Sequence, residues 1–132
     1  NNITQKEENS QNEYKNLDPN KALEYAHLGK TLATKLNFKI GIASCLDNIG
    51  TLFYEKGEYE IALVNYFKAL KLNEAIGNKV GNSNNLSNIG IIYRTLKKYD
   101  KALEYQFKGL KKLTKVCLPE PFSLSRRACG FR

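Results

Sequence analysis

Apolar side chains recur along the chain with the spacing of α-helices. Between Ala62 and Leu70 they stand three, four and seven residues apart, while Asn65 and Lys68 fall on the opposite side. We find no stretch in which apolar and polar residues alternate as they do in a strand. The pattern therefore predicts five helices, which lie near 18–36, 40–56, 59–76, 80–97 and 100–116.

Residues near the ends of these helices support the predicted start and end positions. Asp18 followed by Pro19 is typical of an N-cap and the first helical position, where the missing N–H of proline costs little. Gly57 suits the left-handed conformation that ends a helix, here the predicted helix 40–56. Asn37 or Gly77 suits the same role at the boundary between hairpins, after the predicted helices 18–36 and 59–76.

The predicted helices repeat with a step of forty residues. Leu-Asp-Asn-Ile-Gly at 46–50 returns as Leu-Ser-Asn-Ile-Gly at 86–90, and Ala-Leu occurs at 22, 62 and 102. A helical hairpin of this length has more apolar surface than its own two helices cover, so hairpins must stack to bury the remainder. The sequence thus predicts an all-α fold, an α-solenoid of about two and a half stacked antiparallel helical hairpins.

Small residues recur where paired helices must come close together. Gly50 and Gly90 are forty residues apart, as are Ala62 and Ala102 on the partner helices. We expect a bulky substitution at any of the four to force the helices apart.

These residues resemble the tetratricopeptide repeat, in which an apolar-small pair, an aromatic, a glycine turn, a tyrosine and an alanine recur in order. Here they are Ile49-Gly50, Phe53, Gly57, Tyr59, Ala62, Tyr66 and Ala69. The second copy keeps Ile89-Gly90, Tyr93, Tyr99 and Ala102, but departs from the pattern at Lys97, Gln106 and Gly109. The forty-residue step is similar to that of the long variety of this repeat.

The resemblance divides the chain into three parts. It covers 18–116, which we expect to form the solenoid, and implies a protein-protein interaction module within a larger signalling, regulatory or scaffold protein. Residues 1–17 form a polar N-terminal segment or a degraded first helix. Residues 117–132 form a tail outside the repeat, which is either a cap over the last helix or a scar of truncation or altered reading frame.

The resemblance also implies that the first helix of each hairpin lines a concave groove that holds a peptide. In the resembled family, asparagines just before the apolar-Gly pair hold the peptide backbone, which points to Asn48 and Asn88; the alternative is that asparagine simply tolerates an exposed helical site. Some members of the resembled family hold the C-terminal carboxylate of a peptide with a clamp of basic side chains. We expect no such clamp here, because Asp47 and Ser87 stand where lysine or arginine would be needed. The candidate groove residues are Ser44, Asp47, Asn48, Thr51, Tyr54, Asn84, Ser87, Asn88, Ile91 and Arg94.

Charge adds a second candidate surface. The chain carries a net charge of +8, but residues 1–60 contribute −2 and residues 61–132 contribute +10. This asymmetry favours acidic partners. A row of lysines on the last helix, with Tyr105 among them, is the alternative site for nucleic acid or another acidic surface, although such a row is more often a solvated outer face. The row consists of Lys101, Lys108, Lys112 and Lys115.

The sequence offers little for catalysis or for a cofactor. The single histidine, His27, stands where the other units have phenylalanine, which favours a packing role. Cys45, Cys117 and Cys129 lack the close pairs of a zinc site. We therefore expect a non-enzymatic protein without metal or cofactor, located in the cytoplasm and away from membranes. A purely structural role, in which exposed end faces drive self-association, remains open.

Overall fold

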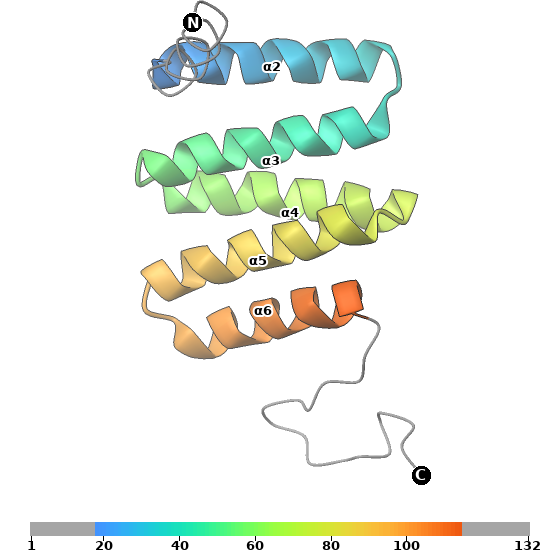
Figure 1. Ribbon diagram of the computed structural model, residues 1–132. Coiled ribbons are helices and arrows are strands. Elements are labelled where there is room, and N and C mark those ends of the chain that lie inside the picture. The colour runs from blue at the N-terminus through green and yellow to red at the C-terminus, as the bar shows by residue number, and fades with distance from the viewer. Residues whose placement is uncertain (1–17, 115–132) are drawn as a thin grey trace, which may run out of the picture.

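The computed structural model describes residues 18–114, and five helices run through them (Figure 1). They are α2 (Pro19–Lys35), α3 (Lys39–Glu55), α4 (Tyr59–Ile76), α5 (Lys79–Thr95) and α6 (Tyr99–Thr114). Each lies within two residues of its predicted position, and the part of the chain that is described contains no strand. The predicted all-α fold is thereby confirmed. The segment 1–17 and the tail 117–132 lie outside the described residues.

The helix ends follow the predicted local chemistry. The carboxylate of Asp18 accepts a hydrogen bond from the N–H of Asn20 at 3.1 Å, with Pro19 as the first residue of α2. Gly57 and Gly77 adopt left-handed backbone angles with φ of 81° and 71°, and Asn37 does so with φ of 51°. The left-handed residues after α2, α3 and α4 are therefore those that the sequence indicated.

Lys97 occupies the same left-handed position after α5, with φ of 61°, although it carries a side chain. Its counterpart forty residues earlier is Gly57. We expect Lys97→Gly to raise the free energy of unfolding by about 1 kcal/mol, because glycine removes the steric cost of this conformation. Urea unfolding followed by circular dichroism measures the change.

Lys56 provides the matched control for this substitution. It ends α3 with an ordinary right-handed φ of −76°, so Lys56→Gly should instead lower stability by about 0.5–1 kcal/mol through the added freedom of the unfolded backbone. Equal effects of the two substitutions would show that the left-handed conformation of Lys97 carries no strain.

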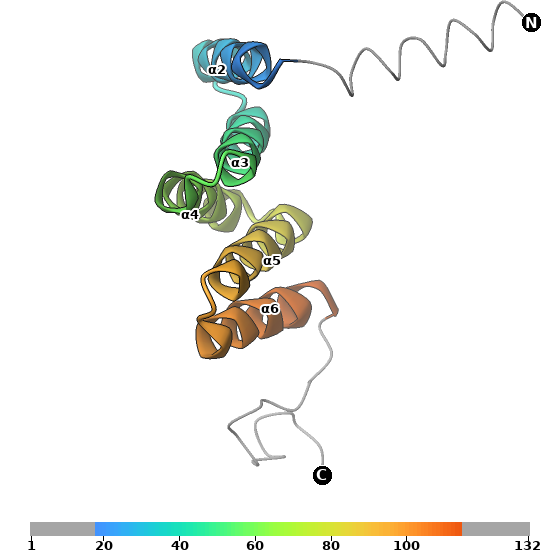
Figure 2. The ribbon, with the colours of Figure 1, turned by 90° about the vertical axis from the view of Figure 1, so that its left-hand side faces the viewer.

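Consecutive helices pack antiparallel against each other, so that the chain builds a stack of hairpins. Viewed close to the helix axes, the stack forms a zigzag in which α3 and α5 lie on one side and α4 on the other (Figure 2). Helix α3 also touches α5, whereas α2 touches only α3 among the described helices. In the resembled repeat's terms, α3 and α5 are first helices, and α2, α4 and α6 are second helices.

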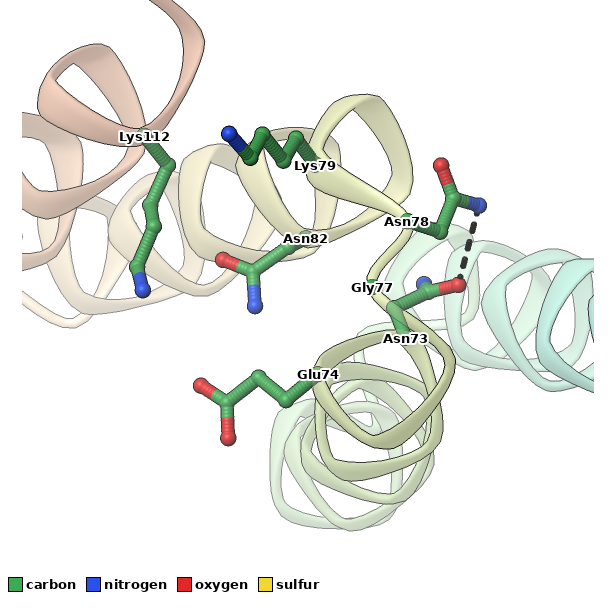
Figure 3. A pocket seen from close by; sticks show the side chains of 7 residues that line it. All are labelled: Asn73, Glu74, Gly77, Asn78, Lys79, Asn82 and Lys112. Atoms are coloured by element: carbon green, nitrogen blue, oxygen red, sulfur yellow. Dashed lines mark hydrogen bonds between the residues drawn. The ribbon is translucent and has the colours of Figure 1, made fainter. Parts of the chain in front are cut away.

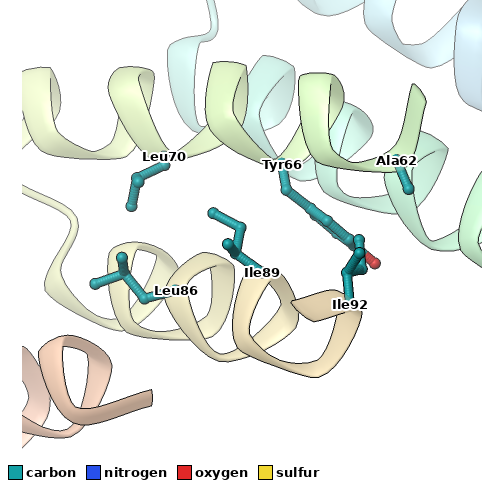
Figure 4. Close-up of a cluster of buried hydrophobic side chains, with 6 residues drawn as sticks. All are labelled: Ala62, Tyr66, Leu70, Leu86, Ile89 and Ile92. Carbon is teal, nitrogen blue, oxygen red and sulfur yellow. The ribbon is translucent and has the colours of Figure 1, made fainter. Parts of the chain in front are cut away.

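The best-buried apolar cluster lies between α4 and α5, where two hairpins meet (Figure 4). Its members are Ala62, Tyr66 and Leu70 from α4 and Leu86, Ile89 and Ile92 from α5. Ile89 and Ile92 are completely buried. Burial of these side chains at about 25 cal/mol per Å² of apolar surface is what holds successive hairpins together.

The two glycines of the repeat lie at equivalent helix crossings. A Cβ atom on Gly50 would lie 2.9 Å from ring atoms of Tyr66, and a Cβ atom on Gly90 would lie 2.7 Å from Cγ of Gln106. Tyr66 and Gln106 are themselves forty residues apart. The predicted close approach, which depends on glycine at both positions, is confirmed.

The expected packing role of His27 is wrong, because its side chain is exposed. Phe67, its counterpart in the next unit, packs edge-on against Tyr105 with ring centroids 5.9 Å apart. Forty residues before Tyr105 stands Asn65, whose amide instead donates to the carbonyl of Ile61 in its own helix. Position 65 of α4 therefore offers His27 no aromatic ring of the kind that Tyr105 offers Phe67.

Candidate functional site

Hydrogen bonds connect the predicted groove side of α3 to that of α5. The amide Nδ2 of Asn88 lies 3.2 Å from Oδ1 of Asp47, and the hydroxyl oxygens of Tyr54 and Thr95 are 3.3 Å apart. These hydrogen bonds link the outer sides of the two first helices along their length. We call the surface made by the ten predicted groove residues the first-helix face.

The members of the first-helix face differ in exposure. Ser44, Asn48, Asn84, Ser87 and Arg94 are exposed. Asp47, Thr51, Tyr54, Asn88 and Ile91 are half-buried. A ligand that approaches this face therefore meets four small polar side chains and the charged Arg94 first, and then the half-buried side chains.

Asn48 and Asn88 have different environments despite their equivalent places in the repeat. Asn88 donates one amide hydrogen to Asp47, whereas the amide of Asn48 has no partner among the described residues. The difference arises because Asp47 precedes Asn88 by one unit, and no described helix precedes Asn48 in the same way. Of these two asparagines, Asn48 is the one that offers its complete amide to a ligand.

A chain of buried amides continues inward from Asp47. Oδ1 of Asp47 also accepts from Asn85 at 2.8 Å, and Asn85 in turn accepts from Asn73 at 2.6 Å. Asn73 accepts from Asn78 at 3.1 Å, and Asn78 caps α5 by accepting from the N–H of Gly81 at 3.1 Å. We call Asp47, Asn73, Asn78, Asn85 and Asn88 the asparagine network.

The asparagine network joins three elements that sequence analysis treated separately. One unit earlier, its inner positions 73, 78 and 85 are taken by Ala33, Phe38 and Cys45. The replacement of these apolar side chains by three asparagines in the next unit could have indicated a buried hydrogen-bond network. The sequence analysis did not predict it. Burial raises the pKa of Asp47 above its ordinary value, and the hydrogen bonds from Asn88 and Asn85 oppose that rise.

An open pocket of about 440 Å³ lies beside Asn48, between α2 and α3. We call it the Asn48 pocket. Asn48 and Thr51 are its only lining residues that belong to the first-helix face, and the others are mainly apolar. The lining consists of Ala22, Tyr25, Ala26, Cys45, Asn48, Thr51 and Leu52. An amide at the edge of an apolar hollow suits a ligand with both polar and apolar groups.

A second pocket, of about 450 Å³, lies where α4 ends, α5 begins and α6 passes (Figure 3). Its wall includes Asn82, whose side chain is almost completely buried and whose Oδ1 has no hydrogen-bond partner among the described residues. Glu74 and Lys112 line the same pocket. Lys112 carries donors that an unpaired amide oxygen requires.

Two lysines of the predicted row on α6, Lys108 and Lys101, contact neighbouring side chains. The Nζ of Lys108 bonds to Oε1 of Glu104 at 2.9 Å and lies 5.0 Å from the ring centre of Tyr105. Lys101 lies 5.4 Å from the ring centre of Tyr93. Lys112 lines the pocket of Figure 3, and Lys115 lies outside the described residues. The structure thus gives Lys101 and Lys108 local contacts with aromatic rings and places Lys112 at the wall of a pocket.

The described residues hold no group of three or more His, Cys, Asp or Glu side chains that could bind a metal ion. Cys45 is a free, half-buried thiol, and a Cβ atom on Gly29 would lie 3.3 Å from its sulfur. Among the described helices, none has both the length and the apolar character that crossing a bilayer requires.

Comparison with known proteins agrees with this architecture. A family model described as tetratricopeptide repeat matches residues 41–111, which is more than half of the chain and extends from α3 into α6. The comparisons with curated proteins and with solved structures each gave no match. The chain therefore belongs to the tetratricopeptide repeat family, a family of non-enzymatic repeats that generally serve as protein–protein interaction modules.

Proposed function

We propose that the chain binds a peptide or protein segment of a partner on the first-helix face, at the end marked by Asn48. The observation that carries the proposal is the exposed amide of Asn48 at the edge of the Asn48 pocket. The amide offers two donors and one acceptor, which match the groups of a peptide backbone. The apolar side chains of the pocket supply the contact area that a backbone alone does not give.

The two asparagines that sequence analysis treated as equal take unequal parts in this proposal. Asn88 already gives one hydrogen to Asp47, so one hydrogen and its carbonyl oxygen remain for a ligand. Asn48 therefore dominates binding, and Asn88 assists it. Arg94 and the net charge of +8 favour acidic segments, through attraction that added salt weakens.

Peptides selected against the complete chain from a random display library provide the test. We expect Asn48→Ala to weaken their binding about tenfold, because two hydrogen bonds to the backbone are lost, while Asn88→Ala has a smaller effect. Fluorescence anisotropy of labelled peptides measures the dissociation constants, and circular dichroism checks that helical content is unchanged.

Asn84→Ala serves as the matched control, since Asn84 is also an exposed asparagine on a first helix but lies away from the Asn48 pocket. Because Asn84 belongs to the first-helix face but does not line this pocket, Asn84→Ala should weaken peptide binding clearly less than Asn48→Ala does. Selected peptides that bind equally well to Asn48→Ala would remove this end of the first-helix face from consideration.

A further inference from the structure

The pocket at the end of α4 is separate from the first-helix face, since none of the ten residues of that face lines it. We call it the Asn82 pocket (Figure 3). Its volume of about 450 Å³ is typical of sites that hold small molecules. The lining consists of Asn73, Glu74, Gly77, Asn78, Lys79, Asn82 and Lys112.

Asn82 places an unpaired hydrogen-bond acceptor in the wall of this pocket. The residue is 3% exposed, and its Oδ1 has no donor among the described residues. A buried amide oxygen without a donor destabilises the fold, because it has lost its bonds to water and gained none in exchange. The amide of Asn82 faces the space between Glu74 and Lys112 (Figure 3). A ligand in that space satisfies the oxygen if it carries an N–H group.

The previous unit of the repeat has apolar side chains at the same place. Forty residues before Asn82 and Lys112 stand Ile42 and Leu72, which are both half-buried. Apolar side chains need no hydrogen-bond partner, whereas a buried amide does. The exchange of apolar for polar side chains therefore creates a requirement for a donor that packing alone does not meet, and this indicates a binding role.

The repeat does not assign this place to another part of the chain. By the forty-residue step, residues 115–132 match 75–92, which contain the end of α4 and most of α5. Neither α4 nor α5 contacts α2. In the matching hollow of the previous unit, the segment that follows therefore leaves the α2 side open, and the repeat gives the α4 side of the Asn82 pocket no covering segment.

Two sets of contacts hold the walls of the pocket in place. The hydroxyl of Ser83 donates to the carbonyl of Gly109 at 2.7 Å, and a Cβ atom on Gly109 would lie 3.1 Å from the carbonyl oxygen of Ser83. Helix α6 thus approaches the start of α5 closely, about one turn before Lys112. On the other side, Asn73 donates to Asn85 at 2.6 Å and ties the end of α4 to α5. A ligand therefore meets walls that are already in position.

The polar side chains of the pocket specify the groups of the ligand. Glu74 and Oδ1 of Asn82 are acceptors, which suit an ammonium group, and Lys112 is a donor, which suits a carboxylate. Asn73 and Asn78 each keep one amide hydrogen that their bonds within the asparagine network do not use. These hydrogens suit an acceptor oxygen on the side chain of the ligand.

We infer that the Asn82 pocket binds a free polar α-amino acid, with its ammonium group on Glu74 and Asn82 and its carboxylate on Lys112. The inference goes beyond the proposed function, because it adds a small-molecule site away from the peptide site. An amino acid of this kind carries no net charge, so the net charge of +8 on the chain does not repel it.

Glutamine is the probe, because its side chain ends in an amide with an acceptor oxygen. We expect it to shift the side-chain amide signals of Asn82 saturably in heteronuclear NMR spectra of the complete chain, and to raise the midpoint of thermal unfolding. N-acetylglutamine lacks the ammonium group and glutaminamide lacks the carboxylate. Each should bind about tenfold more weakly than glutamine, because one charged pair is lost.

Variants of the protein locate the site. Lys112→Met should weaken glutamine binding about tenfold, and Glu74→Gln should do so to a similar degree. Lys71→Met should leave it unchanged, since Lys71 is an exposed lysine of α4 outside the pocket. Asn82→Leu should abolish binding and raise the midpoint of thermal unfolding, because it removes the unpaired oxygen and restores an apolar side chain like that of Ile42.

The inference fails if glutamine does not bind, if its two blocked forms bind equally well, or if Lys112→Met binds glutamine as Lys71→Met does. It also fails if glutamine binds without moving the Asn82 amide signals. A lower midpoint of thermal unfolding in Lys112→Met without glutamine would show instead that Lys112 itself donates to Asn82. Binding that appears only after residues 117–132 are removed would identify that tail as the occupant.

Discussion

Gly50→Leu is expected to lower the free energy of unfolding by about 3 kcal/mol or more, the largest effect of any single substitution considered. A Cβ atom alone at this position would lie 2.9 Å from the ring of Tyr66, and that ring belongs to the buried cluster between α4 and α5. A leucine therefore moves α4 away from α3 and disturbs the packing of α4 on α5 as well. The α3–α4 interface and the α4–α5 interface are therefore both weakened.

Urea unfolding of the complete chain measures this loss, and Ser44→Leu is the matched control. Ser44 lies on the same helix but is exposed, so leucine there should change stability by less than about 0.5 kcal/mol. If Gly50→Leu is no more destabilising than Ser44→Leu, then α3 and α4 do not need the close approach seen in the structure.

Asn85→Ala is expected to cost about 2–4 kcal/mol, although it removes only a polar side chain. Asn85 is 1% exposed and bonds to two partners in the asparagine network. Without it, Asp47 keeps only the donor from Asn88, and the Nδ2 of Asn73 loses the acceptor 2.6 Å away. Asn73 stays buried and Asp47 half-buried, so water replaces these bonds only in part.

The same substitution should make stability depend more strongly on pH. Burial raises the pKa of Asp47 in the folded state above the value of 3.8 expected for a free side chain, so the folded state binds its proton more readily. The contribution of Asp47 to stability is then greatest at low pH and is lost as the pH rises through the window above 3.8. Removal of a donor to the carboxylate raises that pKa further, so Asn85→Ala should destabilise more at pH 7 than at pH 4.

Unfolding of the unaltered chain and the variant at both pH values measures the difference. Asn84→Ala is the control, since the neighbouring asparagine is exposed and should have little effect at either pH. Equal destabilisation by Asn85→Ala at pH 4 and pH 7 would mean that the charge of Asp47 does not depend on its bond from Asn85.

The architecture could be predicted because it depends on features that are local in sequence. Helical spacing, left-handed caps such as Gly57 and the forty-residue return of Gly50 at Gly90 each reflect contacts that every unit repeats. The periodic spacing of residues in the sequence locates such contacts without knowledge of the tertiary structure. The family match over residues 41–111 confirms the repeat.

The candidate site was harder to predict because its residues depend on what surrounds them. The repeat in the sequence predicts the same binding role for Asn48 and Asn88. In the structure, however, Asn88 donates a hydrogen bond to Asp47 of the preceding unit, and Asn48 has no such carboxylate beside it among the described residues. Burial of Asn73 and Asn85 was equally hidden, because an amide in a helical pattern is read as a solvent-facing residue. Their pairing requires residues from α4 and α5 to meet Asp47 on α3, which no local pattern expresses.

The two junctions between hairpins differ in how they resist bending. At the α4–α5 junction, the asparagine network depends on bond lengths and angles that weaken steeply when they are distorted. At the α2–α3 junction the matching residues are Ala33, Phe38 and Cys45, whose contacts are non-directional and tolerate sliding. The stack is thus stiff at its centre and compliant near α2, and any change of curvature that accompanies capture of a partner should be concentrated at that compliant joint.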